Sequence, residues 1–453
     1  MPQNKKLEKK STTPKKIKGL ETRLIAAKIL AAIIKQKKSL DGLLDKKSGH
    51  PGFLKLPPLD QNLCRAIILA SLRHHIAIEK QLQGYLKNPL PAKADALSFL
   101  FHISAAQILY LNIPSHAAIF LAVEATKKDP RLRRFTALVN AILRQFAKDG
   151  EKFPLKDSPL TLTPEWFIRL LKLQYDSETI KAIICAQNHQ PPLDITVKDN
   201  PSFWAQKLNA LIVSGNSLRL KEKNLNITEL PGFSEGAWWV QNTASAIPAQ
   251  LMPNIQGKNV ADLCAAPGGK TAQLILQGAN VTAIEKVETR AQRLKENLDR
   301  LQLKAKIHIA DLLTYSPKEN FDAVLLDAPC SSTGTIRRHS DILWNKDLKD
   351  IEQLAQLQYQ LLVRAIKFTK PGGTIIFSNC SLAPQEGEEL IEKILQTYEN
   401  IRLSPLSGEE FPKFKDFLTK DGYLRTHPAS FSHANPLFAG MDGFFAARLI
   451  KIS

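Results

Sequence analysis

Short apolar runs alternate with helical segments from about residue 257 to the C-terminus. The runs are rich in Val, Ile and Leu, and we expect a polar helix over about 288–302, after the second of them. Such alternation is typical of parallel strands joined by helical crossovers, so it predicts an α/β domain with a doubly wound parallel sheet. The five expected strands cover residues 260–263, 281–285, 307–309, 323–327 and 374–378.

A loop of small residues, Cys264–Thr271, follows the first expected strand. Small residues let a ligand approach the backbone at the edge where doubly wound sheets bind ligands. Glu285 ends the second strand, 17 residues after Gly268, and could accept hydrogen bonds from ribose hydroxyls. A P-loop would need Gly where Cys264 stands, which disfavours ATP or GTP binding, whereas a tight turn without a ligand stays an alternative.

Four carboxylates lie at or near the ends of the expected strands. A single acid in such a place is more often a helix N-cap, but four at one edge of a sheet favour a polar ligand. The acids therefore indicate a nucleoside-containing cofactor. They are Asp262, Glu285, Asp311 and Asp327.

Two cysteines follow neighbouring expected strands. Cys330 lies in the segment 327–334 and Cys380 in the segment 378–381, each just past the carboxyl end of its strand. A lone buried cysteine is usually an inert small hydrophobe. Two thiols and a carboxylate beside a predicted cofactor instead favour thiolate chemistry, which requires local activation of a thiol.

The positive charge is concentrated in the first third of the chain. The protein has 453 residues and a formal net charge of +19, and residues 1–150 hold 27 Lys and Arg against 10 Asp and Glu. Residues 1–18 are expected to form a basic flexible tail, and apolar spacing indicates an all-helical bundle over 19–150. RNA or DNA is the expected partner, although a merely solvated basic surface is an alternative.

Other features limit the location and class of the protein. No apolar stretch is long enough for a membrane span, and the N-terminus lacks an apolar signal core. The five cysteines include no Cys-x-x-Cys pair, which disfavours a disulfide framework and a zinc ribbon. We expect a cytoplasmic protein without a bound metal.

The cysteine and small-residue motifs resemble those of S-adenosylmethionine-dependent RNA 5-methylcytosine methyltransferases, and Gly440–Phe445 looks like that family's final hairpin. Scattered residues upstream resemble a NusB-like RNA-binding domain. A NusB-like domain joined to such a catalytic domain resembles the RsmB/Sun family of bacterial 16S rRNA methyltransferases. The upstream residues are Arg23, Asp60, Leu72, Arg73, Gln107, His116, Ala117 and Asn140–Arg144.

The resemblance implies a multidomain protein. The tail would precede an all-α NusB-like bundle over 19–150, a small α+β connector over 151–255, and an α/β Rossmann-like methyltransferase domain over 256–453. The implied cofactor is S-adenosylmethionine, and the implied partner is small-subunit rRNA, bound by a monomer. The implied product carries a methyl group on C5 of cytosine 967 of 16S rRNA.

The resemblance also implies roles for single residues. Glu285 would hold the ribose, although Asp is commoner there in the family, and Asp311 would contact the adenine side. Asp327 would lie near the cofactor and polarise the base, Cys380 would be the nucleophile, and Cys330 would assist product release. The loop around the methionine end of the cofactor would comprise Cys264, Ala265, Ala266, Pro267, Gly268, Gly269 and Lys270.

The chemistry of cytosine agrees with these roles. C5 is a poor nucleophile until a thiolate attacks C6 and makes C5 enamine-like, and Asp327 would stabilise the charge that builds on the ring. The sequence does not decide which group removes the C5 proton. The chain departs from the family at Asn379 (commonly Thr), Asn242 (commonly Asp) and Gly387 (frequently Asn).

Three rival functions stay open. A tRNA 5-methylcytosine methyltransferase would use the same chemistry, and a DNA enzyme would use the Cys of a Pro-Cys motif, here Cys330. A non-catalytic RNA-binding assembly factor could keep the fold, although it would have no need for both thiols and Asp327.

Overall fold

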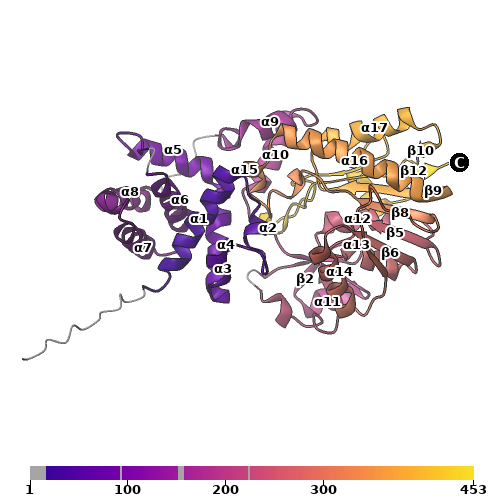
Figure 1. The fold of residues 1–453 in the computed structure, drawn as a ribbon, viewed down its shortest axis with the longest axis horizontal. Helices are drawn as coiled ribbons and strands as arrows, with labels where there is room; N and C mark the ends of the chain where they lie inside the picture. The colour runs from indigo at the N-terminus through magenta and orange to yellow at the C-terminus, as the bar shows by residue number, and fades with distance from the viewer. Residues whose placement is uncertain (1–16, 92–93, 151–157, 223–224) are drawn as a thin grey trace, which may run out of the picture. The chain divides into compact units, whose positions relative to one another are not determined.

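The computed structural model describes residues 17–91, 94–150, 158–222 and 225–453. The chain forms two compact units, Met1–Lys156 and Asp157–Ser453 (Figure 1). The expected basic tail, 1–18, lies almost entirely outside the described residues. Within the described ranges, no helix is long and apolar enough to cross a membrane.

The first unit is a helical bundle. Its apolar stripes bury residues such as Ile29, Leu30 and Ile33 of α1, which packs against α4 and α6. The guanidinium of Arg23 donates to the side-chain oxygen of Gln107 at 2.9 Å inside the bundle. The helices are α1 Leu20–Gln36, α2 Leu40–Leu43, α3 Pro51–Leu54, α4 Pro58–Arg73, α5 His75–Tyr85, α6 Asp95–Tyr110, α7 Ser115–Lys128 and α8 Thr136–Asp149.

The second unit begins with two helices and a small antiparallel sheet of order β2-β3-β1-β4. The helical stretch expected over 164–187 is divided, because the Asp176 side chain caps a new helix by accepting from the Thr179 N–H at 2.8 Å. The hairpin β2–β3 was not predicted. The elements are α9 Glu165–Leu171, α10 Ser177–Gln187, β1 Asp194–Val197, α11 Pro201–Lys207, β2 Ala210–Ser214, β3 Ser217–Leu220 and β4 Trp238–Val240.

A buried ion pair anchors this small sheet. The Arg219 guanidinium donates to both carboxylate oxygens of Asp194, at 2.7 and 2.9 Å, and also to the carbonyl oxygens of Phe438 and Gly440. Burial alone would raise the pKa of Asp194, but hydrogen bonding and charge from Arg219 bring it below its usual value. The pair therefore fixes the small sheet against the segment that leads into the last strand.

An eight-stranded sheet forms the centre of the second unit, in the order β10-β12-β9-β8-β5-β6-β7, with β11 paired to β12. The five strands expected from the sequence are present and parallel. The sheet is mixed, because β12 pairs antiparallel with β9, β10 and β11. The strands are β5 Asn259–Leu263, β6 Asn280–Glu285, β7 Lys306–Ile309, β8 Phe321–Asp327, β9 Thr369–Asn379, β10 Ile401–Leu403, β11 Leu424–Thr426 and β12 Phe444–Lys451.

Helices cover both faces of this sheet (Figure 1). Helices α16 and α17 pack on one face around Leu362 and Ile391, and α12 and α13 pack on the other around Ile247 and Leu274. The layers leave the carboxyl ends of the parallel strands free for a ligand site. The helices are α12 Thr243–Gln250, α13 Gly269–Leu276, α14 Glu288–Arg300, α15 Ile342–Asn345, α16 Leu348–Phe368 and α17 Glu388–Thr397.

Candidate active site

A cavity of about 340 Å³ lies at the carboxyl ends of the parallel strands. Three of the four acids singled out from the sequence line it, and so do both cysteines. The fourth acid, Asp262, is fully buried and borders a neighbouring cavity of about 380 Å³. The predicted site residues that line the first cavity are Cys264, Ala266, Glu285, Asp311, Asp327, Cys330 and Cys380.

The loop Cys264–Lys270 separates the two cavities. Cys264 has a left-handed backbone (φ 62°) directly after β5, and Gly268 has a φ of 103°, a conformation that favours glycine. The chain thereby turns sharply from β5 into α13. Cys264 lines the first cavity, Ala266 lines both, and the other loop residues from Ala265 to Lys270 line the second.

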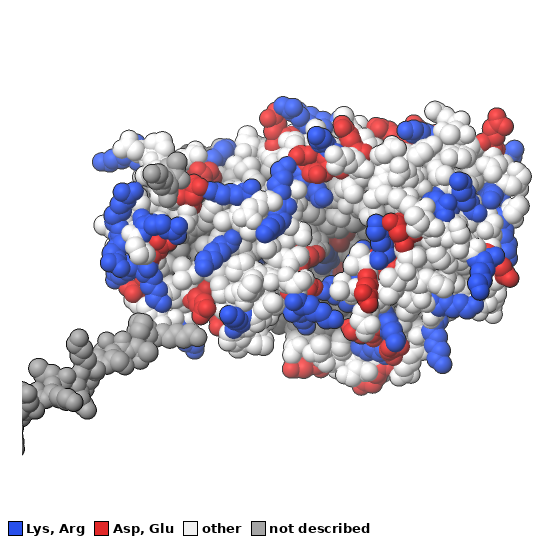
Figure 2. Space-filling view, viewed as in Figure 1, with Lys and Arg blue, Asp and Glu red and all other residues white. Residues whose placement is uncertain are grey.

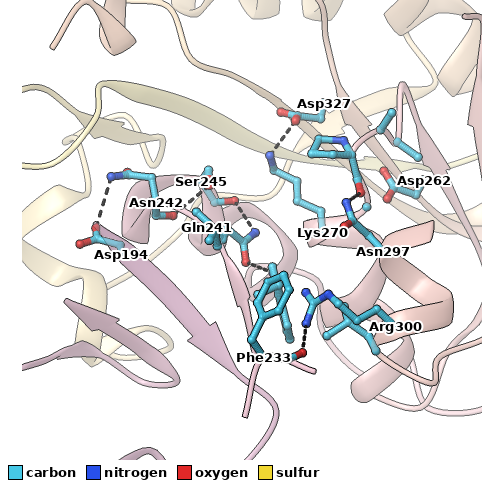
Figure 3. A pocket seen from close by; sticks show the side chains of 18 of the residues that line it. Asp194, Phe233, Gln241, Asn242, Ser245, Asp262, Lys270, Asn297, Arg300 and Asp327 are labelled. Carbon is cyan, nitrogen blue, oxygen red and sulfur yellow. Dashed lines mark hydrogen bonds and ion pairs between the residues drawn. The ribbon is translucent and has the colours of Figure 1, made fainter. Parts of the chain in front are cut away.

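Lys270 and Asp327 form an ion pair where the two cavities meet. The Lys270 ammonium donates to Oδ2 of Asp327 at 2.6 Å, as Figure 3 shows, and the Ser378 hydroxyl donates to Oδ1 at 3.1 Å. The ammonium also lies 5.0 Å from the centre of the Phe444 ring. Asp327 is therefore held as an acceptor beside a fixed positive charge.

Glu285 and Asp311 form the wall of the first cavity farther from the thiols along the sheet. The buried Glu285 accepts from the Val287 N–H at 3.0 Å through Oε1. Its Oε2 has no hydrogen-bond partner among the described residues and lies 3.5 Å from an Arg290 nitrogen. Asp311 pairs with Lys286 at 2.8 Å, and this hydrogen bond lowers the pKa of Asp311.

This wall fits an adenosyl group. The Oε2 atom of Glu285 is a buried acceptor that receives no hydrogen bond from the part of the chain that the structure describes, as expected of a carboxylate that receives ribose hydroxyls. Apolar side chains of Val287, Leu312 and Leu313 line the same wall and can contact the faces of a base. The residues present therefore fit a nucleoside-containing cofactor.

The thiols of Cys330 and Cys380 lie 3.4 Å apart, and both line the first cavity. The hydrogen bond to Cys380, followed by burial, raises the pKa of Cys330 well above that of a free thiol. Cys330 therefore stays protonated and can donate its S–H to Cys380. Burial also raises the pKa of Cys264, which leaves that thiol inert.

A buried carboxyl group lies behind the two thiols. Glu386 is fully buried and accepts hydrogen bonds from Ser331, Ser381 and Gln358. The sequence interpretation missed Glu386 and Gln358, because nothing in their local pattern shows that they reach the cysteine loops. It also missed Phe444, although that residue lies in the Gly440–Phe445 run, and it missed Leu357 and Leu361 of α16.

The three departures from the family pattern have local explanations. The amide of Asn379 donates to the Gln358 side chain at 2.9 Å and to the Glu386 carbonyl at 2.6 Å. A Cβ at Gly387 would lie 2.5 Å from an Arg425 nitrogen. Asn242 caps α12 by accepting from the Ala244 N–H at 2.9 Å, as an Asp would.

Comparison with known proteins identifies the family. The model of the NusB family matches residues 20–148, and the model described as 16S rRNA methyltransferase RsmB/F matches residues 249–450. The ribosomal RNA small subunit methyltransferase B of Pasteurella multocida is 33% identical over 96% of each chain. The chain belongs to this methyltransferase family. The protein of the same name from Proteus mirabilis is 34% identical over 83% of this chain and 92% of its own.

Membership makes the protein an S-adenosylmethionine-dependent RNA cytosine-C5 methyltransferase. Solved structures agree with the fold. A crystal structure of PH0851 superposes with a TM-score of 0.71 at 23% identity and covers 96% of this chain and 99% of its own. A methyltransferase homolog from Pyrococcus horikoshii has a TM-score of 0.51 at 26% identity and covers 64% of this chain and 100% of its own.

Proposed function

We propose that the protein methylates C5 of a cytosine in small-subunit rRNA in the cytoplasm, with cytosine 967 as the specific target. The relatives that span nearly the whole chain carry the name ribosomal RNA small subunit methyltransferase B, which supports this substrate. The observation that carries the chemical part is the pair of thiols, 3.4 Å apart, on the cavity that also holds Glu285 and Asp327.

The polar side chains around the cavity carry out different parts of the reaction. The loop 264–270 and the carboxylates of Glu285 and Asp311 hold the cofactor, which when bound supplies an electrophilic methyl group. Asp327 accepts a hydrogen bond from the exocyclic amine of the flipped cytosine, and the adjacent Lys270 provides positive charge where the ring becomes electron-rich.

Cys380 provides the nucleophile. Its thiolate forms a bond to C6, which makes C5 able to take the methyl group. A base then removes the C5 proton, the C5–C6 double bond returns, and the bond between C6 and the Cys380 sulfur breaks. Cys330, protonated and 3.4 Å from Cys380, stabilises the thiolate by donating its S–H and assists the final release.

We assign RNA binding outside the cavity to the bundle 19–150, with residues 151–255 as a connector to the catalytic domain 256–453. Figure 2 shows many Lys and Arg side chains over the bundle, at the left of the view. Exposed cations gather at the corner formed by α7, the turn after it and α8, where they can neutralise phosphates. They are Lys127, Lys128, Arg131, Arg133, Arg134 and Arg144.

Methyl transfer from labelled S-adenosylmethionine tests the substrate. Unmodified small-subunit rRNA and unmodified tRNA are incubated separately with the protein, and the labelled nucleotide is mapped in each. We expect a single 5-methylcytosine in the rRNA, at position 967. Label in tRNA alone would contradict the proposed substrate, and label at another rRNA cytosine would contradict the proposed position.

A further inference from the structure

Glu386 is a buried acid behind the thiols whose carboxyl group accepts four hydrogen bonds. The reaction described above does not use it. It follows the loop after β9, its side chain is fully buried, and it does not border the cavity that holds the thiols. Its contacts therefore act on protein groups rather than on substrate or cofactor.

Four donors converge on this one carboxyl group. Its Oε1 accepts from the Ser331 backbone N–H at 2.9 Å and from the Gln358 amide at 2.7 Å. Its Oε2 accepts from the hydroxyls of Ser331 and Ser381, the latter at 2.5 Å. A carboxylate is acceptor-only and can satisfy all four donors, so both oxygens of Glu386 are engaged. Burial raises the pKa of this carboxyl group, and the four hydrogen bonds oppose that shift.

The two serines are the residues that directly follow the two cysteines. Ser331 follows Cys330 and Ser381 follows Cys380, so each thiol is one residue away from a hydroxyl bound to the same oxygen atom. The two hydroxyls are themselves 3.0 Å apart. Glu386 thus joins two loops that are 50 residues apart in the sequence, at the point where their thiols are 3.4 Å apart.

We propose that Glu386 is a positioning residue that sets the separation and direction of the two thiols, through Ser381 for the nucleophile and through Ser331 for the release thiol. This inference rests on the proposed roles of Cys380 and Cys330. It assigns different kinetic steps to two serines that are chemically alike, equally buried and bound to the same carboxylate.

The serine variants separate positioning from general stability. Ser381→Ala, Ser331→Ala and a control, Ser340→Ala, each remove one buried hydroxyl, and the Ser340 hydroxyl donates to the Ile336 carbonyl of its own turn at 3.2 Å. Under single turnover with unmodified rRNA and S-adenosylmethionine, denaturing gels follow the formation and decay of the covalent protein–RNA adduct.

We expect opposite effects on the adduct. Ser381→Ala slows adduct formation about 10- to 100-fold and leaves its decay unchanged, because the nucleophile is misplaced. Ser331→Ala slows decay by about the same factor, so that adduct accumulates. Ser340→Ala changes neither rate. If both variants at the thiols slow the same step equally, or only lower the melting temperature, the proposal is wrong.

A second measurement needs neither RNA nor cofactor. Diamide takes two electrons and two protons from the pair of thiols, which become a disulfide, while diamide is reduced to its hydrazine. We expect Glu386→Gln to slow formation of the Cys330–Cys380 disulfide about tenfold relative to the wild type and to Ser340→Ala, because an amide cannot accept from all four donors. An unchanged rate in folded Glu386→Gln would overturn the proposal.

Different results would overturn the role of Cys380 and the positioning role of Glu386. If Cys380→Ala keeps full methyl transfer, Cys380 is not the nucleophile and the proposed mechanism is wrong, yet the diamide rate still reports whether Glu386 positions the thiols. If Glu386→Gln does not fold, the two serine variants alone decide, since each leaves the carboxylate and its other donors in place.

Discussion

The buried acids on the two sides of the proposed catalytic cavity differ in how many hydrogen bonds they accept. On the nucleoside side, which comprises Glu285, Asp311 and the apolar residues next to them, one oxygen of the buried Glu285 accepts no hydrogen bond from the described residues and lies 3.5 Å from an Arg290 nitrogen. On the thiol side, which comprises Cys330, Cys380 and the groups behind them, Glu386 receives four donors.

The difference separates binding groups from supporting groups. A buried acceptor without a donor is costly, so it is retained where a ligand supplies the donor. A carboxylate whose oxygens already accept hydrogen bonds from protein groups does not bind a ligand. It instead fixes the groups that donate to it. We therefore expect substitutions on the nucleoside side to change cofactor affinity and substitutions behind the thiols to change stability and thiol geometry.

Glu386→Ala should have the largest effect on stability. It leaves buried donors from two loops and from α16 without an acceptor, and we expect a loss of about 3–4 kcal/mol in the free energy of unfolding. Urea unfolding measures it, and titration with S-adenosylmethionine on the folded variant should give an unchanged Kd. A large rise in Kd without loss of stability would reverse the comparison.

Asp262→Asn tests a buried acid in which one carboxyl oxygen accepts a hydrogen bond from the protein and the other does not. Asp262 is fully buried and accepts from the Thr271 hydroxyl at 2.6 Å through Oδ2, and within the described ranges its Oδ1 has no hydrogen-bond partner. Burial raises its pKa to about 7. The folded state therefore binds the proton more tightly than the unfolded state, and stability falls as the pH rises towards 7.

The Asn side chain does not titrate. The free energy of unfolding of the variant should therefore rise relative to that of the wild type by about 1.4 kcal/mol for each pH unit between about pH 4 and pH 7. Above pH 7 the gain should stay constant. Urea unfolding of both proteins at pH 5, 6, 7 and 8 measures this. A difference that does not vary with pH would show that Asp262 is already ionised at pH 5 in the folded state.

Glu285→Ala should weaken the binding of S-adenosylmethionine about 10- to 30-fold, because hydrogen bonds from the ribose to a buried charged acceptor are lost. Isothermal titration calorimetry measures the Kd. Glu285→Asp is the matched control, since it keeps a carboxylate and should bind within a few-fold of the wild type. Equal affinity of the Ala variant and the wild type would remove Glu285 from the cofactor site.

Asp311→Asn should have the smallest effect. Its carboxylate is about one-third exposed and already paired with Lys286, so we expect the Kd for the cofactor to rise only about two- to fivefold. The effect should shrink further in high salt. A loss of affinity larger than that of Glu285→Ala would mean that the exposed acid, and not the buried one, dominates the nucleoside side.

The sequence predicted residues that line the cavity better than it predicted the groups behind the thiols. Glu285 and Asp311 could be found because each follows an apolar run, and the ends of parallel strands meet at one edge of a sheet. The two cysteines could be found in the same way. Glu386 could not, because its importance depends on a loop that brings it under Ser331, 55 residues earlier in the chain.

The fold was likewise predictable where local sequence patterns determine it and not where tertiary contacts do. The five parallel strands β5, β6, β7, β8 and β9 were predicted because each contains a short run rich in apolar residues. Strand β12 was anticipated only as a hairpin by resemblance, since both of its faces are largely buried and its sequence lacks alternation. The pairing of β12 with β9, which makes the sheet mixed, is a tertiary contact that local patterns do not encode.

The most direct test of the account compares Cys380→Ala with Cys330→Ala. Both are incubated with unmodified small-subunit rRNA and labelled S-adenosylmethionine, and methyl transfer and covalent adduct are measured in parallel. The account predicts that Cys380→Ala transfers no methyl group and forms no adduct, whereas Cys330→Ala accumulates adduct. Full methyl transfer by Cys380→Ala, with adduct lost in Cys330→Ala, would contradict the account and make Cys330 the nucleophile.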